Sequence, residues 1–309
     1  MTDPSAAENI AADGIHPFRI EGVPVRGRLV RLSTTLDRVL SHHDYPAPVA
    51  DLLAEAMVLT VMLANAIKFD GVFIFETRGD GPVRLIVVDI TSEGTLRATV
   101  QVDIERLEAV LGNAALAQAP VPRLIGAGQL LFTVDQGPET ERYQGIVELD
   151  GATLADCAHN YFRRSEQIET AIMLVADAAG PEGRHAGGLM VQRMPADDDA
   201  LREGVDDDAW RRSFVLMSSA TRDELLDPAL APCDLLYRLF HEDGVWAYDP
   251  RALRFACRCS RERIEAMLQA LPRDEIETMK QDDQVEVTCE FCGQMEIFDD
   301  AAIEALHAA

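Results

Sequence analysis

The chain has 309 residues, of which 48% are hydrophobic and 26% are charged. These proportions are ordinary for a globular protein, and at roughly 150 residues per domain the length predicts two domains. The 53 acidic residues outnumber the 28 lysines and arginines, which gives a formal net charge of -25. A surface this acidic repels a phosphate backbone, so we expect no nucleic-acid partner.

The sequence predicts no membrane partner, because no stretch reaches about 20 uninterrupted apolar residues. The first residues, Met1–Ser5, lack the basic and apolar stretches of an export signal. We therefore expect a cytoplasmic protein. In a reducing cytosol, its six cysteines do not indicate a disulfide framework.

Residues 1–15 are small, polar and acidic, and we expect a disordered tail. Residues 16–194 alternate between strand and helix patterns. Long helices are predicted over Pro46–Phe69, where apolar residues recur at spacings of three and four, and over Leu154–Ser165. Strands are predicted over Val25–Leu32, Val72–Thr77, Val83–Ile90, Thr95–Val100, Gln129–Val134, Arg142–Glu148, Ile172–Ala176 and Leu189–Arg193. Runs of strands followed by helices favour an α+β class, with an N-terminal core domain of mixed β-sheet and helix.

Residues 195–231 have a different composition from the predicted core domain. Two runs of three aspartates are too charged to pack, yet Trp210–Met217 is apolar, and Thr221 with Glu224 forms a capping-box pattern. We predict an acidic, metastable helical linker whose short helices fold by docking onto another surface. A solvated spacer is the alternative.

Four cysteines carry the strongest chemical signal in the chain. Cys257 with Cys259, and Cys289 with Cys292, form two close pairs separated by an insert long enough for a helix. This pattern is typical of a tetrahedral site in which four thiolates bind one zinc ion, so we predict a C-terminal zinc domain over residues 232–309. Four buried or incidental thiols are the alternative.

The insert between the cysteine pairs supports this prediction. Its expected features are a helix capped by Ser260 with Ile264, Met267 and Leu268 on one face, a helix with Ile276 and Met279 after Pro272, and a strand at Val285–Val287.

On chemistry alone, the zinc can be structural or a redox switch. Zinc-bound sulfurs are thiolates, the form that peroxide or hypochlorite attacks, and Arg258, Arg261 and Arg263 lie close enough in sequence to help hold their charge. Loss of zinc should unfold a small domain of this kind. The competing interpretations are a structural zinc-ribbon adaptor without redox switching, and a thiol oxidoreductase that uses Cys289 and Cys292.

No catalytic residue is predicted, and we expect a protein that is not an enzyme. The seven histidines have no spacing typical of a catalytic or metal site. Cys157 lies on the apolar face of a predicted helix and is expected to be a core residue, while Cys233 has no assigned role.

Several segments carry a resemblance to a known family. In the C-terminal part they are Phe255–Arg263 and Val287–Cys292. Elsewhere they are Val25–Gly27, Leu63–Gly71, Gly79–Pro82, Tyr161–Phe162, Ser165–Gln167, Ala186–Leu189 with Gln192, and Leu235–Glu242. Together they resemble the Hsp33 family of redox-regulated chaperones (33 kDa chaperonins) from about residue 16 to 300.

The resemblance implies a holdase chaperone that works without ATP and is inactive while reduced and zinc-bound. Oxidation would join Cys257 to Cys259 and Cys289 to Cys292, release the single Zn²⁺, and unfold the zinc domain and the linker. The exposed surface would then bind unfolded or partially folded client proteins, and the oxidised chain would form a homodimer. The ring closed by Cys257 and Cys259 is the tighter one, so we expect the Cys289–Cys292 disulfide to form first.

Overall fold

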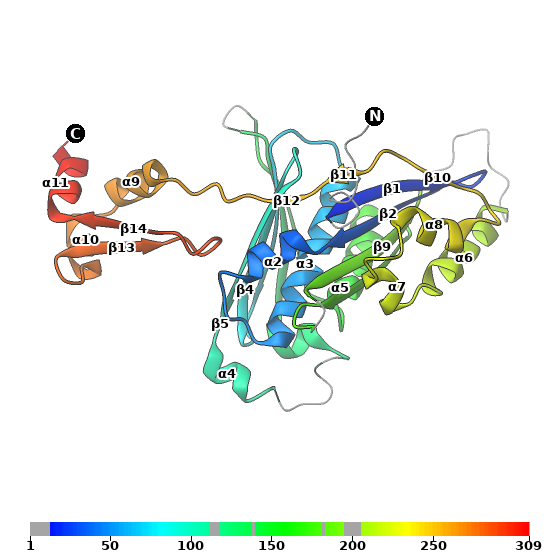
Figure 1. Ribbon diagram of the computed structural model, residues 1–309, viewed down its shortest axis with the longest axis horizontal. Helices are drawn as coiled ribbons and strands as arrows, with labels where there is room; N and C mark the ends of the chain where they lie inside the picture. The colour runs from blue at the N-terminus through cyan, green and yellow to red at the C-terminus, as the bar shows by residue number, and fades with distance from the viewer. Residues whose placement is uncertain are drawn as a thin grey trace. The chain divides into compact units, whose positions relative to one another are not determined.

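The chain folds into two compact units, Met1–Phe255 and Ala256–Ala309 (Figure 1). The structure is a computed structural model that describes residues 13–111, 116, 118–137, 140–180, 183–194 and 205–308. Most of the expected N-terminal tail, and the first part of the expected linker with the acidic run Asp197–Asp199, lie outside the described residues. The α+β class is confirmed, because helices pack on mainly antiparallel sheets in the first unit and on a small hairpin in the second.

The first sheet of the first unit has the strand order β10-β1-β2-β9-β8, and β11 also pairs with β1. Its strands are β1 (Gly14–Ile20), β2 (Val25–Leu32), β8 (Thr170–Asp177), β9 (His185–Arg193), β10 (Val245–Ala247) and β11 (Arg251–Ala252). All of these pairs are antiparallel. The expected disorder up to residue 15 is wrong at its end, since Ile15 belongs to β1 and is buried.

The second sheet has the order β12-β5-β4-β3-β6-β7. Its strands are β3 (Val72–Gly79), β4 (Val83–Thr91), β5 (Thr95–Val102), β6 (Gly128–Asp135), β7 (Tyr143–Glu148) and β12 (Arg254–Phe255). Only β12 pairs in parallel, with β5, among the described strands of this sheet. All eight predicted strands are present in the two sheets, most of them longer than predicted by a few residues.

The long helix α3 (Ala47–Ala66) packs against strands of both sheets and forms the centre of the main hydrophobic core. By length and composition α3 is apolar enough to cross a membrane, although no stretch of that kind was predicted from the sequence. Its most apolar window is 78% buried inside the protein, as is usual for a core helix. Pro46 precedes its first turn, and Ile67 leaves the helix with an extended backbone.

Five short helical segments of the first unit lie between Thr34 and Glu166 in the described part of the chain. They are α2 (Thr34–Leu40), α4 (Ile104–Glu108), the π-helical turn η1 (Val121–Ile125), α5 (Leu154–Tyr161) and the π-helical turn η2 (Phe162–Glu166). The helix predicted over Leu154–Ser165 therefore changes its winding after Tyr161. The Asp13 carboxylate accepts hydrogen bonds from three backbone N–H groups at the start of α2, so this residue is ordered as well.

Three further helices form a layer on one face of the first sheet: α6 (Val205–Ser218), α7 (Arg222–Leu226) and α8 (Pro232–Phe240) (Figure 1). We call them the helix layer. The predicted capping box at Thr221 and Glu224 is present at the start of α7. The apolar side of α8 is buried on the sheet, so the first unit continues through α8 to Phe255 and does not end at the expected boundary before Pro232.

The second unit contains α9 (Arg261–Ala270), α10 (Arg273–Met279), the hairpin of β13 (Gln284–Thr288) and β14 (Met295–Asp299), and α11 (Asp300–Ala308). Its buried core consists of Leu268, Ile276, Val285, Phe298 and Ile303. The expected apolar faces are present in part: Met267 and Met279 are 44% and 40% exposed, because the small core has room for only a few side chains.

Candidate metal centre

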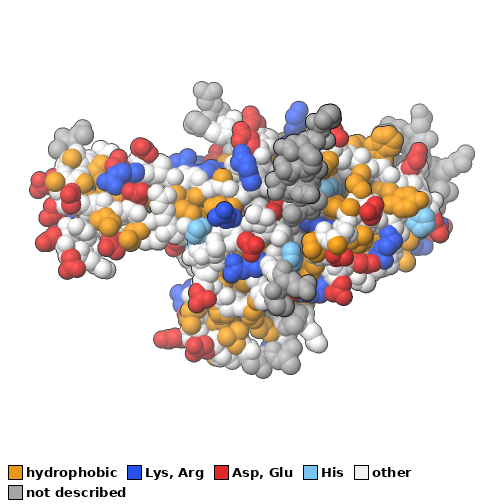
Figure 2. Space-filling model, in the orientation of Figure 1, with side chains coloured by type: hydrophobic (Ala, Val, Ile, Leu, Met, Phe, Trp, Pro, Cys, Tyr) orange, Lys and Arg blue, Asp and Glu red, His pale blue; other side chains and the backbone are white. Residues whose placement is uncertain are grey.

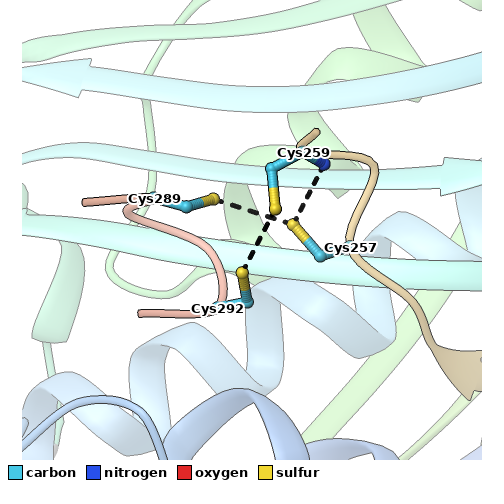
Figure 3. A group of neighbouring side chains, drawn as sticks. All are labelled: Cys257, Cys259, Cys289 and Cys292. Carbon is cyan, nitrogen blue, oxygen red and sulfur yellow. Dashed lines mark hydrogen bonds between the residues drawn. The ribbon is translucent and has the colours of Figure 1, made fainter. Parts of the chain in front are cut away.

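The sulfur atoms of Cys257, Cys259, Cys289 and Cys292 lie within 4.8 Å of one another (Figure 3). The Cys257 and Cys289 sulfurs are 3.7 Å apart, and the Cys259 and Cys292 sulfurs are 3.4 Å apart. Four sulfurs placed about 2.3 Å from a zinc ion form a tetrahedron with edges of about 3.8 Å. The cluster therefore has the dimensions of a tetrahedral thiolate site, and its sulfurs stand much farther apart than the roughly 2.05 Å of a disulfide bond.

The first cysteine pair is positioned by the start of α9. Cys257 and Cys259 precede Ser260, whose side chain caps the helix by accepting a hydrogen bond from the Arg263 N–H. The Cys259 N–H donates to the Cys257 sulfur across 3.5 Å. The tight spacing of this pair thus directs both sulfurs to the same point.

The second pair lies in the turn between β13 and β14. The Cys289 N–H donates to the Gln294 carbonyl at 2.9 Å, and the Gly293 N–H donates to the Cys289 carbonyl at 2.8 Å. Gly293 has a φ of +67°, a left-handed conformation that glycine adopts without strain. The Gln294 side-chain oxygen is also 3.9 Å from the Cys259 sulfur, a contact between the two pairs that the cysteine spacing did not indicate.

Arg261 stabilises the fold around the cluster through contacts away from the sulfurs. Its guanidinium pairs with Glu265 at 3.1 Å and Glu296 at 3.0 Å, and it lies 4.3 Å from the centre of the buried Phe298 ring. The Arg263 guanidinium donates to the backbone carbonyl of Arg258. These contacts give Arg261 and Arg263 structural roles in the second unit.

Two of the four cysteines, Cys259 and Cys292, favour the neutral thiol when no cation compensates their charge. Burial and the neighbouring cysteines raise the pKa of Cys259, and burial is also the main cause that raises the pKa of Cys292. A divalent metal favours the thiolate forms, and its binding releases their protons. The donor set is soft sulfur in tetrahedral positions, which fits zinc.

The two other cysteines lie apart from the cluster. Cys157 is 2% exposed in α5, which confirms the prediction that it is a core residue, and burial raises its pKa to about 12. Cys233, at the start of α8, is exposed.

Comparison with known proteins identifies the family. The Hsp33 protein family matches residues 13–299. The chain belongs to the Hsp33 family. Its Hsp33 relatives include the 33 kDa chaperonin of Caulobacter vibrioides strain NA1000, 39% identical over 299 residues, which cover 96% of this chain and 97% of the relative. The 33 kDa chaperonin of Escherichia coli strain K12 is 36% identical over 288 residues, or 93% of this chain and 92% of the relative.

The fold is shared with a solved Hsp33 structure. The crystal structure of the 33 kDa chaperonin from Thermotoga maritima superposes with a TM-score of 0.77, covering 96% of this chain and 98% of that chain at 23% sequence identity. The resemblance found in the sequence is therefore confirmed: this chain is an Hsp33-family chaperone with a four-cysteine cluster. A chaperone family also fits the expectation of a protein that is not an enzyme.

Proposed function

We propose that this protein is a redox-regulated, ATP-independent holdase that is inactive while reduced and zinc-bound. The observation that carries the proposal is the convergence of four sulfurs within 4.8 Å in a unit whose described residues include five buried apolar side chains. Such a small core contributes little stability alone, whereas a structural zinc ion contributes on the order of 10 kcal/mol in small domains. The state of the four sulfurs then decides whether the unit is folded.

Oxidation by peroxide supplies the switch. Four zinc-bound thiolates, two molecules of hydrogen peroxide and four protons give two disulfides, one Zn²⁺ and four molecules of water. We propose the pairs Cys257–Cys259 and Cys289–Cys292, each formed within its own turn. The shortest contacts join the pairs across the cluster, from Cys257 to Cys289 and from Cys259 to Cys292, so the crossed pairing is the competing outcome for peptide mapping.

The surface that would bind clients is the face of the first sheet beneath the helix layer. Its buried side chains are Phe18, Ile20, Val25, Leu29, Ala171, Val175, Leu189 and Val191, and the helix layer covers them with Met217, Ala220, Leu225, Leu235, Leu236, Leu239 and Phe240. Undocking of the layer would expose two apolar surfaces at once. An exposed apolar surface of this extent is typical of a protein-binding site.

The helix layer is held by polar contacts as well as by burial. The Arg31 guanidinium, on β2, donates hydrogen bonds to the Leu230 carbonyl and, at 2.8 Å, to the Glu224 carbonyl. Glu224 also pairs with Arg238 on α8. We infer that the two hydrogen bonds of Arg31, which we call the clamp, hold the layer on the sheet in the reduced protein. Unfolding of the second unit and of the chain leading to it would favour release.

An aggregation assay tests this function. A chemically unfolded client protein is diluted into buffer without ATP, with reduced or peroxide-treated protein, and light scattering is followed. We expect only the oxidised protein to suppress aggregation, with four thiols lost and about one zinc released per chain. A client kept soluble equally by both forms would overturn the switch, and zinc that resists oxidation would favour the structural zinc-ribbon adaptor.

The oxidised chain is also proposed to form a homodimer, because the apolar face of the released helix layer would favour self-association. Sedimentation of the reduced and the oxidised protein measures the oligomeric state of each form. We also propose a cytoplasmic location without a nucleic-acid or membrane partner, in line with the charge of -25 and with acidic side chains spread over the face seen in Figure 2.

A further inference from the structure

A cavity of about 420 Å³ lies in the first unit, at the ends of both sheets and of α3. Its walls come from β2, β3, β6, β7, β9, the end of α3 and the turn from α5 into η2. Several segments that carried the family resemblance meet there, although none has a part in the metal centre: they contribute Arg26, Lys68, Tyr161, Phe162, Glu166 and Gln192. The volume is in the usual range for pockets that bind small organic molecules.

The interior of this pocket is apolar and largely aromatic. Phe132 forms its centre, with ring centroids 6.1 Å from Phe73 and 5.0 Å from Tyr161. Phe162 is buried beside them, and Met194 completes the wall. Aromatic walls of this kind favour a flat or unbranched apolar body.

One wall of the pocket carries a half-buried cation, Arg28. Its guanidinium donates to the Asn65 side-chain oxygen at 3.0 Å, the Asn65 carbonyl at 3.3 Å and the Gln192 side-chain oxygen at 2.8 Å. These partners are neutral, and no carboxylate among the described residues pairs with Arg28. Burial, and next the charge of Arg26, lower the pKa of Arg28 to about 10, so its positive charge is held at a cost.

The other charged groups on the pocket walls add to this positive character. Arg26 and Lys68 line the pocket with exposed side chains, and the structure gives neither an ion pair within the described residues. Glu166 is the acid in the lining, and its carboxylate accepts a hydrogen bond from the Tyr161 hydroxyl. Three cations around an aromatic cavity form a local exception in a chain with a net charge of -25.

We propose that this pocket binds a small organic anion, a carboxylate on an aromatic or aliphatic body of roughly ten carbons. The apolar body lies among Phe73, Phe132 and Phe162, and the carboxylate replaces the missing counter-ion of Arg28, with Lys68 and Arg26 at the entrance. A charge-assisted pair with a guanidinium at a partly desolvated site is among the stronger polar contacts in proteins. This site lies in the first unit and does not depend on the redox function proposed for the cysteines.

Binding of 2-naphthoate tests the proposal, with its neutral isostere 2-naphthamide as the matched ligand. Isothermal titration uses the reduced, zinc-loaded full chain. We expect saturable binding of one naphthoate per chain, about tenfold tighter than naphthamide, because the charged contact contributes roughly 1.5 kcal/mol. Equal affinity for the two compounds, or no saturable binding of naphthoate, would overturn the proposal.

Variants locate the site. Arg28→Gln should weaken naphthoate binding about tenfold and leave naphthamide nearly unchanged, whereas Arg38→Gln, at an exposed arginine of α2, should change neither. Arg28 also has structural hydrogen bonds, so Lys68→Gln, at an exposed position, is the second test and should weaken naphthoate about threefold. Ala66→Phe should fill the cavity and abolish binding of both compounds. Unchanged naphthoate affinity in folded Lys68→Gln and Ala66→Phe proteins would contradict the assignment.

Discussion

Arg31→Met should release the helix layer from the first sheet without disturbing the metal centre. Arg31 is 5% exposed, and its guanidinium holds the backbone carbonyls of Glu224 and Leu230, on both sides of the turn after α7. Methionine keeps much of the apolar stem but cannot donate a hydrogen bond. The change therefore removes the clamp and preserves most of the packing.

The magnitude follows from the two lost hydrogen bonds. Each bond from a charged donor contributes about 1.5–3 kcal/mol, and part of this sum offsets the cost of burying the guanidinium, which also lowers the pKa of Arg31. A net loss of about 2–3 kcal/mol is expected, which multiplies the undocked population by roughly 30 to 150. The apolar faces of the sheet and of the helix layer would then be exposed in a measurable fraction of reduced molecules.

The assay measures the fluorescence of a hydrophobic dye and suppression of client aggregation, both under reducing conditions, together with the zinc content of the same sample. We expect Arg31→Met to bind more dye and to suppress aggregation while it retains about one zinc per chain. Arg238→Met is the control, because Arg238 pairs with Glu224 within the helix layer and does not join the layer to the sheet. Its side chain is 48% exposed, so the ion pair should contribute less than about 1 kcal/mol. A reduced Arg31→Met protein that binds dye no better than Arg238→Met would refute the clamp.

Three further outcomes are expected. Burial, and next the charge of Asp51, raise the pKa of Glu55 from 4.5 to about 7, so this group should lower the free energy of unfolding progressively as the pH rises from 4.5 to 7. In urea unfolding at several pH values, Glu55→Gln should remove up to about 3 kcal/mol of that loss. Parallel plots of unfolding free energy against pH for the two proteins would contradict this expectation. Phe298→Ala should lower the unfolding free energy of the second unit by about 3–5 kcal/mol and weaken its retention of zinc against a chelator. Met295→Ala, at a side chain that is 51% exposed, is the control and should retain zinc. Equal zinc retention by the two variants would show that the small core does not support the site. An alkylating reagent should modify Cys233 in the native reduced protein and spare Cys157, as mass spectrometry would show, and the reverse order would contradict their assigned burial.

The elements that could be predicted from the sequence are those in which periodicity reflects burial. The strand Val25–Leu32 has the predicted bounds, and the helix predicted over Pro46–Phe69 is α3, because its apolar residues meet sheets on more than one side. β1 was missed since Pro17 lies in its middle and a proline interrupts the usual strand pattern. The strands β10, β11 and β12 have two or three residues each, and only pairing with distant strands forms them.

The candidate metal site was predictable because the spacing of the cysteines carries the information. The cysteines of the first pair are two positions apart and those of the second pair are three apart. The chain between the pairs therefore needs only to fold back for the four sulfurs to meet. The contacts of Arg31 and Arg28 were not predictable, since they join β2 to α7, α3 and β9, and depend on the register of segments far apart in the chain. The second unit begins at Ala256 and not at the predicted residue 232 for a similar reason, because the apolar face of α8 packs on the first sheet.

The most direct test of the switch is the release of zinc from the reduced protein on addition of peroxide, followed with a chromogenic chelator while the client assay runs on the same sample. We expect about one zinc per chain to be released, four thiols to be lost, and suppression of aggregation to appear with the same time course. Zinc that stays bound while suppression appears, or zinc that leaves without any gain of suppression, would contradict the account.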